Sequence, residues 1–203
     1  MGSMNEIVLL RHGQTQWSAT GRHTSYTEKD LTPDGERQAR SLAERLAGRR
    51  FVAVWCSPRV RARRTAELAG LPVSTVDEDL TEWDYGAYEG LTTPQIHEQA
   101  PGWNLWTDGS PGGETPGEVG ARLDRVLDRI RPLLDSGDDG DDGDGGNGGD
   151  VAVVGHGHAL RVLAARWLDL PAAGGALLRL DTGTVSTLGY EHARPVLLSW
   201  NCP

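Results

Sequence analysis

EIVLLRHG at residues 6–13 and VAVVGHG at residues 151–157 are the two stretches that decide the expected fold. Each is a short apolar run that passes into a histidine followed by a glycine. Such a run with a polar end is typical of a buried strand that leads into a loop. The pattern predicts strands over residues 6–10 and 151–154, with His12 and His156 just beyond their carboxyl ends.

Helical patterns alternate with the strands. Residues 33–48 are expected to form a helix, with Thr32 as its N-cap and Pro33 in its first position. Further strands are expected at 52–56 and 73–76, and further helices at 59–69, 115–134 and 159–170. Residues 177–200 should add edge strands, with turns at Gly183 and Pro195. This alternation predicts an α/β fold, a three-layer α/β/α sandwich with a mostly parallel central sheet.

Two segments depart from the alternation. Residues 78–116 lose clear periodicity and gather aromatic residues, glycines and prolines, which is typical of a loop-rich cap over a site. Residues 135–150 contain seven aspartates among glycines and no core-forming residue, so we expect a disordered surface loop. A calcium-binding loop is the weaker alternative, because its closing glutamate is missing.

Composition limits the function classes. The net charge of −9 lies mostly in residues 135–150, and the nearly neutral remainder gives no general electrostatic basis for binding nucleic acid. No apolar run approaches the roughly 18 residues of a membrane helix. One domain over residues 4–203 is expected, because Met1, Gly2 and Ser3 resemble an expression scar. With no signal-peptide pattern and two widely spaced cysteines, Cys56 and Cys202, we expect a cytoplasmic protein with free thiols.

Five motifs, in a fixed order between residues 8 and about 190, carry a resemblance to the histidine phosphatase superfamily. They are LLRHGQTQW, LTPDGERQAR, SPRVRARRTAEL, LTEWDYGAYEGL and VVGHGHALRVLAARWLDL. The superfamily includes the cofactor-dependent phosphoglycerate mutases, and the resemblance therefore implies a phosphoglycerate mutase-like fold. Within it, the chain is most similar to sedoheptulose bisphosphatase-like enzymes and other phosphatases of small metabolites.

The resemblance also implies roles for individual residues. It makes His12 the nucleophile that takes up the phosphoryl group, Glu82 the proton donor and His156 the second pocket histidine. Arg11 and Arg61 become phosphate clamps. The expected substrate contacts are Ser18, Thr24, Tyr85, Gly157 and His158. No metal or cofactor is expected.

These roles agree with the chemistry of an ester hydrolysed without a metal. Such a reaction needs a nucleophile, cations that neutralise the phosphoryl oxygens, and an acid for the leaving oxygen. His12 would attack through an unprotonated ring nitrogen. We therefore expect its other nitrogen to be held by a backbone carbonyl near Gly13.

Departures from the family pattern bear on the substrate. Mutases of this family carry a basic cluster in the cap, whereas this chain has no lysine or arginine between Thr65 and Arg122. A phosphatase is thus favoured over a phosphoglycerate mutase. A catalytically silent phospholigand-binding module is disfavoured because both histidines, both clamp arginines and Glu82 are present. Bisphosphatase relatives have an arginine where this chain has Thr107. A small-molecule ester such as a sugar monophosphate or a nucleoside monophosphate is therefore at least as plausible a substrate as a bisphosphate. A homodimer is left open.

Overall fold

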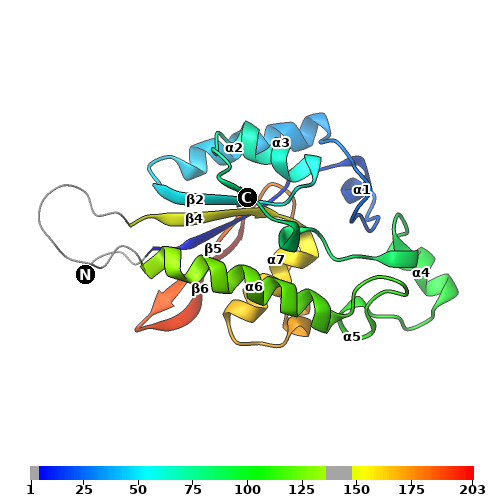
Figure 1. Ribbon diagram of the computed structural model, residues 1–203. Coiled ribbons are helices and arrows are strands. Elements are labelled where there is room, and N and C mark those ends of the chain that lie inside the picture. Colours follow the sequence, from blue (N-terminus) through cyan, green and yellow to red (C-terminus); the bar gives the residue numbers. More distant parts are fainter. Residues whose placement is uncertain (1–4, 136–147) are drawn as a thin grey trace, which may run out of the picture.

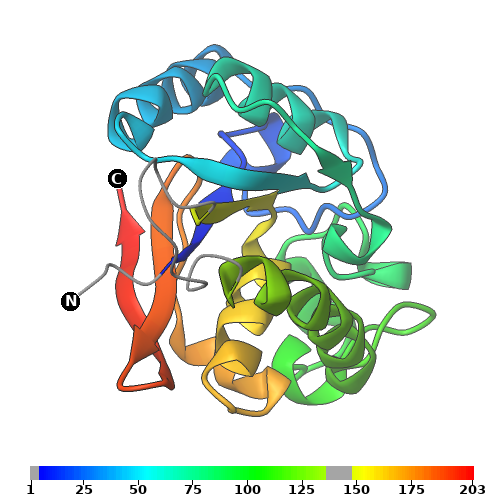
Figure 2. The same ribbon diagram turned by 60° about the vertical axis from the view of Figure 1, so that its left-hand side comes forward.

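The computed structural model describes residues 5–135 and 148–203, which form a six-stranded sheet with helices on both faces (Figures 1 and 2). Most of the loop predicted at 135–150 therefore lies outside the described residues. At its two ends the prediction is wrong, because Asp135 closes a helix and Asp150 opens a strand. None of the helices in the described ranges is both long and apolar enough to span a bilayer.

The sheet has the strand order β3-β2-β4-β1-β5-β6. Its strands are β1 (Ile7–Arg11), β2 (Phe51–Cys56), β3 (Thr75–Val76), β4 (Asp150–Gly155), β5 (Val185–Glu191) and β6 (Arg194–Cys202). The first four run parallel to one another, whereas β5 is antiparallel to both β1 and β6. The predicted mostly parallel sheet is confirmed.

Two helical layers cover the sheet, as Figure 1 shows: α2 and α3 on one face, α6 and α7 on the other. The longer helices are α2 (Pro33–Leu46), α3 (Val60–Leu68), α6 (Pro116–Asp135) and α7 (Gly157–Trp167). Because side chains alternate along a strand, Val8 and Leu10 pack into the core under α2 and α3. Ile7 and Leu9 pack into the core under α6 and α7. The predicted three-layer α/β/α sandwich is confirmed.

The predicted cap at 78–116 contains short helical pieces. They are η1 (Glu78–Leu80), η2 (Gly86–Tyr88), α4 (Thr93–Gln99) and α5 (Leu105–Asp108); outside the cap lie α1 (Gln16–Ala19) and η3 (Ala172–Leu177). The piece α4 follows from its N-terminal sequence, because Thr92 and Gln95 form a capping box. Figure 1 shows α4 and α5 beyond the end of the sheet that α1 also borders.

Two of the expected boundaries that differ from the structure concern the C-terminal turn and the start of α7. The C-terminal turn lies at His192 and Ala193, which have positive φ angles of 48° and 62°, and not at Pro195. Pro195 belongs to β6, an edge strand that tolerates a residue without an N–H. The helix α7 begins at Gly157 rather than at residue 159, because His156 already takes the N-cap position. The N–H groups of the first helical turn have no partner within the helix, and this earlier start places them at the site described next.

Candidate functional site

A polar cavity of about 210 Å³ opens where β1 and β4 end. These strands are parallel neighbours, with Arg11 paired to Gly155, so the residues that follow them meet at one edge of the sheet. The rings of His12 and His156 lie 5.2 Å apart between centroids. The cavity is lined by Arg11, His12, Thr15, Ser18, Gly21, Arg22, His23, Thr24, Glu82, Tyr85, Thr93, Gly157 and His158.

Most of the predicted site residues border this cavity. Those that do are Arg11, His12, Ser18, Thr24, Glu82, Tyr85, Gly157 and His158. Arg61 and His156 do not line it: both side chains have 0% exposure and lie beneath His12. The structure thus gathers the expected residues in one place, eight at the lining of the cavity and the other two buried next to it.

His12 is held in one orientation. Its Nδ1 lies 2.8 Å from the carbonyl oxygen of Gly13. A carbonyl only accepts, so Nδ1 carries the proton and Nε2 keeps a free lone pair; the predicted backbone acceptor is confirmed. Burial lowers the pKa of His12 well below its ordinary value, and the nearby charges of Arg61 and Arg11 lower it further. The ring is therefore neutral, as a nucleophile must be.

The turn after His12 is equally constrained. The N–H of Gly13 donates to Thr65 Oγ1 on α3 at 3.0 Å. A Cβ atom at Gly13 would lie 2.3 Å from the backbone oxygen of Gly35, at the start of α2. Only glycine lets these two backbones approach so closely. The first turn of α2 and Thr65 of α3 therefore fix the position of the imidazole.

His156 is neutral, like His12. The Nε of Arg61 donates to His156 Nδ1 at 3.2 Å, which leaves the ring proton on Nε2, 2.7 Å from Ser57 Oγ. Burial is the main cause that lowers the pKa of His156 well below its ordinary value, followed by the charges of Arg61 and His12.

Arg61 ties α3 to the loop that forms one wall of the cavity. Its two terminal nitrogens donate to the carbonyl oxygens of Thr24, Ser25 and Thr27 at 2.9 to 3.3 Å. Together with its bond to His156, these contacts engage every nitrogen of the guanidinium. Burial lowers the pKa of Arg61. Arg61 therefore supplies its charge from below the cavity while holding the loop in place.

Arg11 has donor capacity left for an anion. One terminal nitrogen donates to the carbonyl oxygen of Leu180, while Nε is buried and has no hydrogen-bond partner among the described residues. A Cβ atom at Gly157 would lie 3.1 Å from the Arg11 Cζ, so glycine lets the start of α7 lie close against the guanidinium. A buried donor without a partner is costly, and a phosphate oxygen would satisfy it.

Glu82 is anchored to the start of α7. Its Oε1 accepts hydrogen bonds from the backbone N–H groups of Trp83 and Ala159, at 2.9 and 2.8 Å. Its Oε2 accepts one bond, from the N–H of His158 at 3.0 Å. Each carboxylate oxygen can accept two hydrogen bonds. Oε2 therefore retains a lone pair in a side chain that borders the cavity.

A cluster of rings forms the remaining wall. The Tyr85 hydroxyl and His158 Nδ1 lie 2.6 Å apart, and the ring of His23 stacks on His158 with centroids 6.1 Å apart. Burial lowers the pKa of His158 well below its ordinary value and raises that of Tyr85 well above it, so both groups are neutral. His23 was not predicted; its only signal is its place in the loop between the first strand and the helix at 33–48.

Acid should destabilise the fold, because burial depresses the pKa of the histidines at 12, 156 and 158. Below about pH 6.5 the unfolded chain takes up protons that the folded chain does not, so stability is lost as the pH falls from there towards the folded pKa values. Each histidine contributes up to about 1.4 kcal/mol per pH unit. Chemical denaturation at pH 7.5 and 5.5, in buffers without phosphate, measures this loss.

A variant tests which groups cause that loss. His158→Gln should show a smaller decrease in the free energy of unfolding between pH 7.5 and 5.5 than the parent chain does. An equal or higher stability of the parent chain at pH 5.5 would contradict the expectation.

Comparison with known proteins identifies the family. Residues 7–203 match the sequence profile of the histidine phosphatase superfamily (branch 1), and the chain belongs to this superfamily. It is 43% identical over 196 residues to an acid phosphatase of Mycobacterium tuberculosis, covering 95% of this chain and 90% of the relative. The solved structure of an open reading frame from the same organism superposes with a TM-score of 0.88 at 41% identity, covering 98% of both chains.

Two further relatives show the range of named activities. The chain is 37% identical over 188 residues to sedoheptulose 1,7-bisphosphatase of Saccharomyces cerevisiae, covering 80% of this chain and 67% of that protein. It is 30% identical over 201 residues to a probable phosphoglycerate mutase of Salmonella choleraesuis, covering 97% and 90%. The predicted resemblance is confirmed, and the chain is a phosphatase of the histidine phosphatase superfamily.

Proposed function

We propose that this phosphatase hydrolyses a small hydroxylated phosphate monoester, a sugar phosphate, through a phosphohistidine at His12. The observation that carries the proposal is the held His12 ring, with Nδ1 bonded to Gly13 and Nε2 free, in a cavity that Arg11 also lines. The Nε of Arg11 has no hydrogen-bond partner in the part of the chain that the structure describes. A phosphoryl group seated there would meet a nucleophile and a cation at once.

The first step transfers the phosphoryl group. His12 Nε2 attacks phosphorus, a new P–N bond forms, and the P–O bond to the leaving group breaks. Glu82, carrying a proton in this step, donates it to the leaving oxygen from Oε2. Arg11 binds the phosphoryl oxygens directly. Arg61 adds positive charge from beneath through its contact with His156.

The second step returns the enzyme to its starting state. The Glu82 carboxylate takes a proton from water, whose oxygen attacks phosphorus as the P–N bond breaks. Inorganic phosphate leaves, and His12 regains its lone pair.

The lining of the cavity supports a small sugar phosphate. Five hydroxyl side chains border it, from Thr15, Ser18, Thr24, Tyr85 and Thr93. Hydroxyl groups both donate and accept, which suits the hydroxyls of a sugar. A volume of about 210 Å³ also lies below the roughly 300 Å³ at which pockets for drug-sized ligands begin. A bulky base therefore fits less well than a compact sugar.

A substrate screen tests this function. We expect release of inorganic phosphate from sugar monophosphates with a kcat/KM at least about tenfold above that for nucleoside monophosphates, a difference of roughly 1.4 kcal/mol. Activity should persist in chelator. Phosphoryl exchange between positions of a phosphoglycerate, without release of phosphate, would instead indicate a mutase. Preference for nucleoside monophosphates, or loss of turnover in chelator, would contradict the proposed substrate or mechanism.

The compartment proposed for the protein is the cytoplasm. Both cysteines are free, Cys56 buried in the core and Cys202 partly exposed in β6. Free thiols are usual where the surroundings are reducing.

A further inference from the structure

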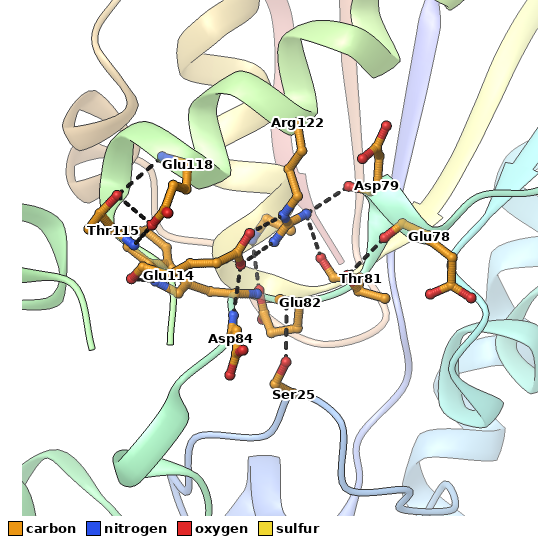
Figure 3. A network of polar contacts seen from close by, with 12 residues as sticks. Ser25, Glu78, Asp79, Thr81, Glu82, Asp84, Glu114, Thr115, Glu118 and Arg122 are labelled. Atoms are coloured by element: carbon orange, nitrogen blue, oxygen red, sulfur yellow. Dashed lines mark hydrogen bonds and ion pairs between the residues drawn. The ribbon is translucent and has the colours of Figure 1, made fainter. Parts of the chain in front are cut away.

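Arg122 is a buried arginine that does not border the cavity. It projects from α6 with an exposure of 7%. One terminal nitrogen donates to the backbone oxygens of Asp79 and Thr81, at 2.7 and 2.9 Å. The other two nitrogens bind both oxygens of the Glu114 carboxylate, at 2.7 and 3.0 Å. Figure 3 shows Arg122 at the centre of this network.

Glu114 extends the network to the other side of Glu82. Its carboxylate accepts the N–H of Asp84 at 2.9 Å, and its backbone N–H donates to the Asp84 carbonyl oxygen at 2.9 Å. Its own carbonyl accepts the indole N–H of Trp83 at 2.9 Å. Ser25 adds a bond to the carbonyl oxygen of Glu82 at 3.2 Å (Figure 3). The carbonyl of Thr81 before Glu82, and the N–H and carbonyl of Asp84 after it, are therefore held.

Glu82 depends on these contacts because it lies in irregular chain. It falls between η1 and η2, so no helix or strand sets the direction of its side chain. Its carboxylate is bonded to α7, whereas the backbone of Thr81 and Asp84 on either side is bonded through Arg122 and Glu114 to α6. The distance of Oε2 from a bound ester is thus determined by how these two helices hold the segment.

We infer that Arg122 and Glu114 are positioning residues for Glu82, and that their ion pair sets its competence as proton donor. The inference rests on the proposed function, in which Glu82 protonates the leaving oxygen. Arginine is required because its planar fork serves two carbonyls and a carboxylate together. A lysine at the same position keeps the charge but, with three donors on one atom, cannot reproduce this geometry.

Arg122→Lys tests the inference through the leaving group. An alkyl phosphate needs a proton on its leaving oxygen, whereas p-nitrophenyl phosphate has a leaving group that departs without one. We expect kcat/KM for the alkyl ester, which reports on phosphoryl transfer to His12, to fall about 10- to 100-fold, the cost of misplacing a catalytic group by about 1 Å. The kcat/KM for p-nitrophenyl phosphate should fall less than about threefold, because the second step, in which Glu82 acts as base, does not enter this ratio.

Arg125→Lys is the matched control. Arg125 lies one turn further along α6 and binds the side chain of Asp79, but it contacts neither Glu114 nor the backbone beside Glu82. Its side chain is exposed. We expect no selective loss on the alkyl ester. If Arg125→Lys and Arg122→Lys behaved alike, or if Arg122→Lys slowed both esters equally, Arg122 would be a structural residue only.

A double-mutant cycle with Glu82→Gln separates this inference from the proposed function. Glu82→Gln alone should slow the alkyl ester selectively; if it does not, the proton-donor role fails and the inference fails with it. If it does, Arg122→Lys should add almost nothing in the Glu82→Gln background. An undiminished effect of Arg122→Lys there would overturn the positioning role alone. Glu114→Gln, which keeps the side-chain shape, provides the same test should Arg122→Lys not fold.

Discussion

Replacing His12 with alanine is expected to lower kcat/KM for phosphate release by roughly 10⁴-fold or more, because the step that forms the P–N bond is lost. The variant should fold normally. The His12 side chain is small, and the turn around it is held by backbone bonds of Gly13 to α3 that do not involve the imidazole.

The same experiment identifies the intermediate. Turnover quenched in alkali should leave one phosphoryl group per chain, labile to acid and located at His12 in the parent protein. His192→Asn is a suitable control, since His192 is an exposed histidine in the β5–β6 turn and asparagine tolerates its positive φ. Full activity of the His12 variant, or a phosphoryl group on another residue, would contradict the mechanism.

Replacing Arg61 with lysine should damage both activity and stability, although the charge is kept. Lysine cannot donate to three loop carbonyls and to His156 at once, so buried acceptors at Thr24, Ser25 and Thr27 lose their partners. We expect a loss of about 3 kcal/mol in the free energy of unfolding. The kcat should fall about 100-fold as the loop and His156 shift.

Denaturant unfolding and steady-state kinetics on the same samples measure both effects. Arg63→Lys provides the comparison, since Arg63 lies on the same helix with an exposed side chain. It should change neither quantity appreciably. Were Arg61→Lys as stable and active as the Arg63 variant, the loop bonds of Arg61 would be of no consequence.

Local pattern was enough to predict the centre of the site. The apolar runs before His12 and His156 indicate buried strands, and parallel strands end at one edge, so the two histidines had to meet. The contact between His12 and Gly13 also followed from chemistry, because an attacking imidazole needs its other nitrogen held.

The second half of the site could not be predicted in this way. Glu82 lies in chain without periodicity, and only the family resemblance singled it out. Arg122 lies in a predicted helix, where an arginine ordinarily faces solvent. Its acceptors are backbone carbonyls, which every residue has, so no sequence pattern marks them. His23 and the turn at residues 192–193 depend in the same way on contacts formed only in the folded chain.

The strand order has a consequence for synthesis of the protein. β1 and β2 do not pair with each other; each pairs with β4, whose residues follow more than two thirds of the chain. While residues 150–155 have not yet left the ribosome, β1 and the β2–β3 pair each have an unpaired edge. His156 is then also missing from its place beside His12. Such edges are prone to incorrect pairing. Assembly of the centre must wait for the carboxyl-terminal quarter, and a ribosome-bound fragment ending before it would be unable to turn over substrate.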